Sequence, residues 1–126
     1  MIVVAIGVNN FRDNNAEEIA EGIRLIIRTL KKKSPSATIL LLGPFPAGEN
    51  EKDPLRIRYR NVHQLIAPLG ELESVIYKNI GSPYILEDGT LDYTLMRADN
   101  IHLAPKGYYI WAESIQPEID NIFGLY

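Results

Sequence analysis

The chain has 126 residues, of which 46% are hydrophobic and 23% charged, as in an ordinary globular domain. A net charge of −3 gives no electrostatic signature of a nucleic-acid partner, and the absence of cysteine excludes disulfides and thiolate chemistry. No apolar run approaches the roughly 20 residues needed to span a bilayer, so we expect no membrane span and a cytoplasmic location.

The first half of the chain predicts two buried strands with a helix between them. Ile2 to Ile6 is an apolar, largely β-branched run closed by Gly7, which is typical of a strand buried in a parallel sheet. Asn15 and Glu18 have the spacing of a capping box. The helix that they open carries an apolar stripe, which consists of Ile19, Ile23, Ile26, Ile27 and Leu30.

A second strand is predicted at residues 38–42 and a third at residues 74–78. The helix between them begins at Asp53-Pro54, which is a favourable pair for a helix start. Its predicted buried face consists of Leu55, Tyr59, Val62, Ile66 and Leu69. His63 lies off this stripe, so we expect it to face solvent.

Residues 79–103 form a long irregular stretch, and loops of this length in compact domains are usually functional or disordered. Its hydrophobic anchors favour a functional loop. Pro105 opens the last helix, and Pro117 lies inside that helical pattern, so we expect a kink or a break about one turn before Pro117. The shared apolar face of this helix consists of Tyr108, Trp111, Ile115, Ile119 and Ile122.

The order β-α-β-α-β-α predicts a single α/β domain over residues 1–126. We expect a three-layer α/β/α arrangement with a parallel sheet and right-handed crossovers. Ligands of such sheets lie beyond the carboxyl ends of the strands. Two segments, at residues 7–10 and 43–46, follow strand ends directly, and the loop at residues 99–102 precedes the last helix. All three are therefore expected to meet at one rim.

His102 is the strongest candidate for chemistry, because Asp99 precedes it by three residues at this rim. A carboxylate bonded to one imidazole nitrogen fixes the tautomer and leaves the other nitrogen free as a general base. A structural alternative is that Asp99 caps a turn while His102 packs on Tyr108. Neither a metal-ligand spacing nor a phosphate-binding loop occurs, so we expect no metal and no cofactor.

Asn9 and Asn10 follow the first strand through Gly7. An asparagine amide at a strand end can donate a hydrogen bond to a developing oxyanion. The alternative is an ordinary polar turn, because asparagine tolerates left-handed conformations.

Taken together, these segments resemble the SGNH (GDSL) hydrolase family, and most closely its platelet-activating-factor acetylhydrolase-like branch. The sequence IGVNN at residues 6–10 resembles the family's third block, G-x-N-D. Residues 41–49, LLGPFPAGE, resemble the strand and loop that follow in this branch. DNIHL at residues 99–103 and PKGY at residues 105–108 resemble the fifth block, D-x-x-H-L, and its helix.

The resemblance implies a flavodoxin-like fold and a serine esterase that acts on small acyl esters. It implies that His102 is the general base, that Asp99 orients it, and that Asn9, with Gly7 and Asn10 beside it, contributes to the oxyanion and substrate site. The family also begins with a strand ending in G-D-S, whose serine is the nucleophile, and this block is absent from the chain. We therefore expect an SGNH fold truncated at its N-terminus, with the nucleophile outside the chain.

The missing strands have a physical consequence. Without them the strand at residues 2–6 becomes an apolar edge, which is a template for pairing. We expect either a homo-oligomer or a separate N-terminal fragment to pair along this edge. Two other functions stay open: a catalytically inactive truncated homologue that serves as an oligomerising structural module, and a flavodoxin-like binding module that shares only the architecture.

Overall fold

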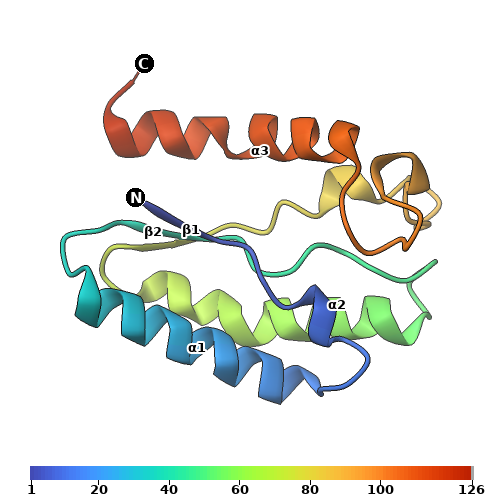
Figure 1. Cartoon of the computed structure of the whole chain (residues 1–126), viewed down its shortest axis with the longest axis horizontal. Coiled ribbons are helices and arrows are strands. Elements are labelled where there is room, and N and C mark those ends of the chain that lie inside the picture. Colours follow the sequence, from blue (N-terminus) through green and yellow to red (C-terminus); the bar gives the residue numbers. More distant parts are fainter. Residues whose placement is uncertain (126) are drawn as a thin grey trace.

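Three short parallel strands form the middle layer of the molecule, with helices on both faces (Figure 1). This computed structural model describes residues 1–125. The strands are β1 (Ile2–Val4), β2 (Ile39–Leu41) and β3 (Val75–Tyr77). The helices are α1 (Ala16–Lys33), α2 (Pro54–Ile66) and α3 (Pro105–Phe123). Four short 3₁₀ turns lie between them: η1 (Val8–Asn10), η2 (Ala67–Glu71), η3 (Ser82–Tyr84) and η4 (Tyr93–Leu95).

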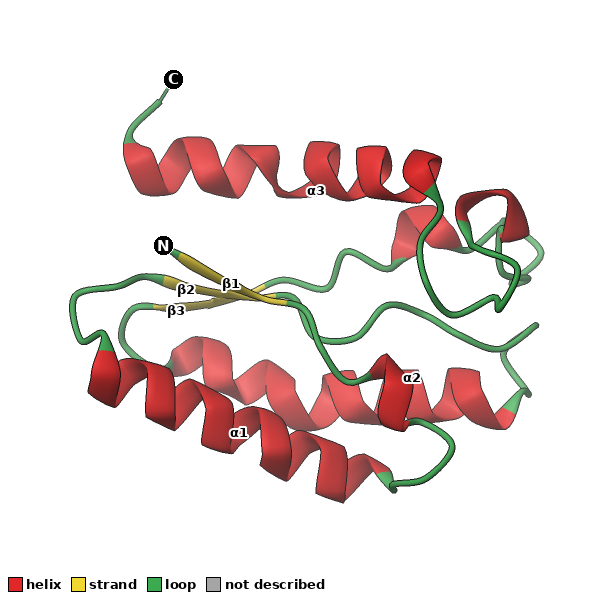
Figure 2. Ribbon diagram, in the orientation of Figure 1, coloured by secondary structure: helices red, strands yellow, loops and turns green. Residues whose placement is uncertain are grey.

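The sheet order is β1-β2-β3, and all pairs are parallel, with Ile2 opposite Ile39 and Ile39 opposite Val75. Helices α1 and α2 cover one face of the sheet, and α3 covers the other (Figure 2). The predicted three-layer α/β/α arrangement is therefore confirmed. Strand β1 is one edge of the sheet, and its outer side is unpaired within residues 1–125.

Alternating strand residues feed two apolar cores on opposite faces of the sheet, as the period of two in a β-strand requires. Ile39 and Leu41 of β2 pack with the buried stripes of α1 and α2. Leu40 and Leu42 pack instead with Ile115 of α3. Residues 39–42 are all fully or almost fully buried, which explains why β2 and the residue after it form a continuous apolar run in the sequence.

The predicted starts of α1 and α2 are confirmed. The Glu18 amide donates to the Asn15 side chain at 2.8 Å, and the Asn15 amide donates to the Glu18 carboxylate at 3.2 Å, which completes a capping box. At α2, the Leu55 amide donates to the Asp53 carboxylate at 2.9 Å, and Pro54 occupies the first turn.

Three details of the sequence prediction were wrong. Strand β1 ends at Val4, and the Ile6 side chain is 48% exposed. Helix α3 continues from Pro105 to Phe123, so a break about one turn before Pro117 does not occur; this side of the helix faces solvent, and the carbonyl freed by the proline can bond water. Tyr108 is half exposed, whereas Ile115 of the same stripe is buried.

Candidate active site

His102 lies on a tight loop that connects η4 to α3. The loop is closed by an antiparallel bridge between Met96 and Leu103 and by a hydrogen bond of 2.7 Å from the Arg97 amide to the His102 carbonyl. Asn100 takes the left-handed conformation at its tip (φ 57°), which asparagine adopts more readily than most residues. The loop therefore has a defined shape, and it presents its side chains at the start of α3.

The start of α3 is itself fixed to the neighbouring loop. The Tyr84 hydroxyl donates to the Gly107 carbonyl at 2.8 Å. A side chain at Gly107 would place its Cβ 2.3 Å from the Leu95 carbonyl oxygen, so only glycine allows this approach. The close contact between α3 and η4 holds the His102 loop from behind.

Asp99 and His102 form a short hydrogen bond of 2.5 Å between a carboxylate oxygen and Nδ1 of the ring. The other oxygen of Asp99 accepts from the amides of Ile101 and His102, each at 3.0 Å. The bond from the His102 ring, followed by these two amide bonds, holds the pKa of Asp99 well below its usual range. Because the carboxylate accepts at Nδ1, that nitrogen carries the proton and Nε2 is left as an acceptor.

Gly7 and Asn9 follow β1 at the same rim. Gly7 has φ 123°, and a Cβ there would meet Ile19 of α1 at 3.2 Å, so the backbone turns close to the helix. The chain then makes the single turn η1, on which the Asn9 side chain is exposed. The side-chain amide of Asn9 makes no hydrogen bond within the part of the chain that is described.

These residues line one cavity of about 220 Å³ between the end of β1, the His102 loop and the first turns of α3. Its lining consists of Ala5, Ile6, Gly7, Val8, Asn9, Phe45, Ile101, His102, Leu103, Tyr108 and Trp111. The structure thus brings Gly7, Asn9 and His102 together at the carboxyl ends of the strands, and Asp99 contacts His102 at the margin.

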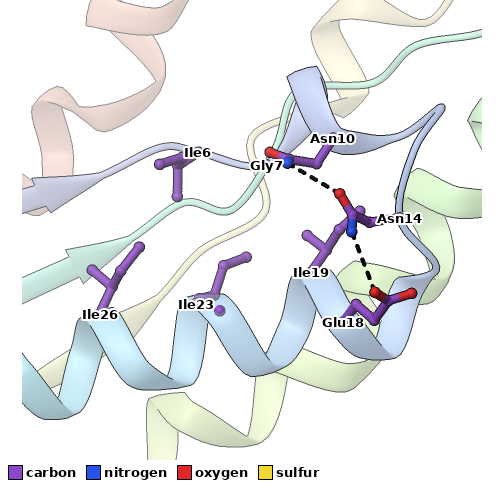
Figure 3. Close-up of a pocket in the computed structure, with 9 residues that line it drawn as sticks. Ile6, Gly7, Asn10, Asn14, Glu18, Ile19, Ile23 and Ile26 are labelled. Carbon is purple, nitrogen blue, oxygen red and sulfur yellow. Dashed lines mark hydrogen bonds between the residues drawn. The ribbon is translucent and has the colours of Figure 1, made fainter.

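Asn10 lies elsewhere. Its amide donates to the Asn14 side chain at 3.2 Å, and it lines a separate groove of about 190 Å³ between the end of β1 and α1 (Figure 3). Figure 3 also shows Ile6, Ile19, Ile23 and Ile26 along this groove, with the polar residues at one end. The structure therefore separates Asn10 from His102 although Asn9 and Asn10 are neighbours in sequence.

No serine or threonine of residues 1–125 lines the cavity that contains His102. Ser114, on α3, donates to the Ile110 carbonyl one turn earlier. Ser74 and Ser82 lie next to β3 and in η3, away from the cavity lining. The cavity therefore has a candidate base and hydrogen-bond donors but lacks a hydroxyl of the kind that such a base activates.

Two polar residues of α2 are buried, which the sequence did not lead us to expect. His63 is only 5% exposed, so the prediction that it faces solvent was wrong. Arg56 is equally buried and donates to the carbonyls of Ala47, Gly48 and Gly89. The spacing contained a signal, because His63 stands four residues after Tyr59 and therefore on the same face of the helix.

Across residues 1–125 no group of three His, Asp or Glu side chains lies close enough together to hold a metal ion. None of the helices described is long and apolar enough to cross a membrane.

Comparison with known proteins finds matches to one family. Residues 1–110 match the model of the GDSL-like lipase/acylhydrolase family. The chain is 37% identical over 109 residues to platelet-activating factor acetylhydrolase IB subunit alpha2 of Gallus gallus, and 36% identical to that of Homo sapiens. Each alignment covers 86% of this chain but 46% of the relative, so the chain spans about half the length of these relatives.

Solved structures agree on the fold. A GDSL-like lipase from Bacteroides thetaiotaomicron superposes with a TM-score of 0.69 at 17% identity, covering 97% of this chain and 62% of that one. A structure from Streptococcus pneumonia superposes with a TM-score of 0.71 at 19% identity, covering 94% and 58%. The family match, the relatives and the shared fold lead to one conclusion: the chain belongs to the GDSL-like lipase/acylhydrolase family.

Proposed function

We propose that this chain is the part of an SGNH-type serine ester hydrolase that carries the general base His102 and its orienting carboxylate Asp99. The nucleophilic serine comes from outside residues 1–126, and the substrates are small acyl esters. The observation that carries the proposal is the cavity itself, in which His102, Gly7 and Asn9 meet. The short bond from His102 Nδ1 to Asp99 leaves Nε2 free to accept a proton.

The chemistry follows the serine esterase scheme. The serine oxygen attacks the ester carbonyl carbon while its proton passes to His102 Nε2, and the protonated ring is stabilised by Asp99. The carbonyl oxygen becomes an oxyanion, to which the Asn9 side-chain amide and the Gly7 backbone can donate. The intermediate then collapses, the proton on Nε2 passes to the leaving alcohol, and water later releases the acyl group by the same steps.

We expect the serine to arrive on a strand that pairs along the free edge of β1. The cavity lies at the carboxyl end of β1, so a strand that pairs parallel to β1 delivers the residue after its own end into this cavity. The outer side of β1 is open, and its residues Ile2 to Val4 are apolar.

The groove between β1 and α1 supports pairing on this side. Its apolar wall, seen in Figure 3, extends along α1 to Leu25, which is 54% exposed. Exposed apolar surface of this kind marks an interaction site. A fragment equivalent to the unmatched half of the relatives would cover both the strand edge and the groove.

The open edge of β1 also favours a second candidate function, that of an oligomerising structural module. If a second copy of the chain pairs antiparallel along β1, the partner strand ends at the opposite side of the sheet and brings nothing to the His102 cavity. The protein is then an oligomerising structural module without hydrolase activity. The orientation of the added strand therefore separates the two functions.

The experiment joins this chain to the segment that precedes the matched region in the Gallus gallus relative, where the resemblance places the G-D-S block. We expect this chimera to hydrolyse p-nitrophenyl acetate. His102→Ala should lower the rate by at least about 10³-fold, as removal of a general base does in serine hydrolases. Tyr109→Ala, which truncates an exposed side chain off the cavity, is the matched control and should leave the rate unchanged.

The chain alone should show no hydrolysis above background and should self-associate in sedimentation experiments. Val3→Lys, which places a charge on the edge strand, should shift it towards monomer. A folded chimera that is inactive, or whose activity survives His102→Ala, would overturn the assignment of His102. A stable monomer of the unmodified chain would overturn the pairing along β1.

A further inference from the structure

The buried histidine of α2 forms hydrogen bonds at the ends of two neighbouring strands, β2 and β3. His63 Nε2 lies 2.8 Å from the Pro44 carbonyl oxygen, just after β2, and Nδ1 lies 2.6 Å from the Tyr77 hydroxyl, at the end of β3. A carbonyl can only accept, so Nε2 carries the proton and Nδ1 accepts from Tyr77. Burial lowers the pKa of His63 and raises the pKa of Tyr77 to about 12, which keeps both groups neutral in this arrangement.

The segment after β2 is held to α2 at two places. His63 binds the carbonyl of Pro44, while Arg56, seven residues earlier on the same face of α2, binds the carbonyls of Ala47 and Gly48. Gly43 lies against the His63 ring, and a Cβ there would be 2.7 Å from Cε1. The backbone on both sides of residue 45 is therefore fixed by donors from one helix.

Phe45 lies between these two attachments, and its ring forms part of the wall of the His102 cavity. Its ring centroid is 5.8 Å from that of Trp111 and 5.3 Å from that of Tyr84, both in edge-to-face geometry. Since Trp111 lines the same cavity, a shift of Phe45 changes the space available beside His102.

We propose that His63 is a positioning residue of the candidate active site. Through the Pro44 carbonyl it sets the place of the Phe45 ring, and through that ring it limits the size of the acyl group that the cavity accepts. The inference rests on the proposed function only for what the cavity binds. The coupling from His63 to Phe45 and Trp111 is a property of the fold and can be tested without hydrolysis.

The test uses Trp111, which is the chain's single tryptophan and so reports on the cavity wall alone. Quenching of its fluorescence by acrylamide measures access to the indole. His63→Leu removes both hydrogen bonds, and we expect the quenching constant to rise by about twofold as the wall opens locally. His63→Gln can still donate to Pro44 and should restore the quenching constant of the unmodified protein.

Two further variants separate positioning from general stability. Tyr77→Phe removes the other partner of His63 and should lower the urea midpoint while leaving the quenching constant unchanged. Gln64→Leu changes an exposed neighbour on the same helix and should leave the quenching constant unchanged. The proposal is overturned if His63→Leu leaves quenching unchanged, or if quenching in all variants simply follows the urea midpoint.

The effect on acyl size is measured in the chimera. His63→Leu should raise the rate with p-nitrophenyl butyrate relative to acetate, and His63→Gln should return the ratio to that of the parent. An unchanged ratio with altered quenching would overturn the part of the proposal that concerns acyl size. An inactive chimera with altered quenching would instead contradict the proposed function and leave the coupling supported.

Discussion

The two histidines of this chain lie in opposite kinds of environment. His63 is buried in α2, and both of its ring nitrogens have a protein partner. His102 lies on a loop with about half of its side chain exposed, and only Nδ1 has a partner, the Asp99 carboxylate. A ring with both nitrogens engaged holds the structure in place, whereas a ring with one free nitrogen can transfer a proton.

The difference extends to the regions around them. Around His63 the loop after β2 is fixed by helix donors and a close glycine contact. The surroundings of His102 consist of a short turn, the Asp99 carboxylate and a cavity beside the residues that follow β1. We expect changes near His63 to affect folding strongly, and changes near His102 to leave folding almost intact while altering the chemistry of the ring.

The largest effect on stability is expected from a substitution at Gly43, where the buried surroundings of His63 leave no space for a side chain. Gly43→Ala puts a methyl group 2.7 Å from the His63 ring at a residue with φ 69°, so both the contact and the backbone conformation oppose it. We expect a loss of roughly 2 to 4 kcal/mol in the free energy of unfolding, measured by urea denaturation.

Gly22→Ala is the matched control for this prediction. A Cβ at Gly22, in the middle of α1, would have no neighbour within 4 Å. It should stabilise the chain by roughly 0.5 to 1 kcal/mol, because alanine is the better helix residue. A Gly43→Ala protein as stable as the parent would show that the packing around His63 is loose.

A smaller effect on stability is expected from lowering the pH, through the buried His63. Burial lowers the pKa of His63 below the value of about 6.5 that it has in the unfolded chain. Below about pH 6.5 the unfolded state therefore takes up a proton that the folded state excludes. The free energy of unfolding should fall with decreasing pH by at most about 1.4 kcal/mol per pH unit until the folded-state pKa is passed.

This contribution can be isolated by comparing urea denaturation between pH 5 and pH 6.5. His63→Gln has no titrating group at residue 63, so its free energy of unfolding should fall less steeply with decreasing pH than that of the parent. Gln64→Leu should keep the slope of the parent. Equal slopes in the parent and in His63→Gln would mean that His63 is not held neutral.

The smallest effect on folding is expected at the open site. Asp99→Ala removes an acceptor from two amides and from the His102 ring, but all of these groups can reach water. We expect the free energy of unfolding to change little, because solvent screens interactions at an exposed site. The proton on Nδ1 should then redistribute towards Nε2, which ¹⁵N NMR of the ring reports directly. A ring still protonated at Nδ1 in this variant would contradict the role of Asp99.

The layers of the fold and the meeting of Gly7, Asn9 and His102 could be predicted, because both follow from the period of the apolar residues and from the rule that parallel strands end on one side. Neither rule could predict that the side chains of Asn9 and Asn10 line different cavities. Successive residues of a 3₁₀ turn point about 120° apart, so neighbours in η1 face different cavities.

His63 was misplaced for a different reason. A polar residue is assigned to the surface unless its partners are known, and both partners of His63 are distant in sequence: a backbone carbonyl after β2 and a hydroxyl at the end of β3. Every residue has a backbone carbonyl, so the sequence cannot show which one binds a side chain, and Tyr77 is expected only as a residue of the third strand. Only the folded arrangement shows that this ring is satisfied inside the protein.

The connections from β1 to β2 and from β2 to β3 both run through helices on the same face of the sheet (Figure 2). Parallel strands are joined by right-handed crossovers almost without exception. The side on which the next strand is added therefore determines which face of the sheet the connecting helix covers. A strand added outside β1 and linked into it by such a crossover must carry its helix on the face of α1. That helix would lie in the groove of Figure 3. The handedness of the crossover therefore predicts that one added strand and its helix cover both the edge of β1 and the groove.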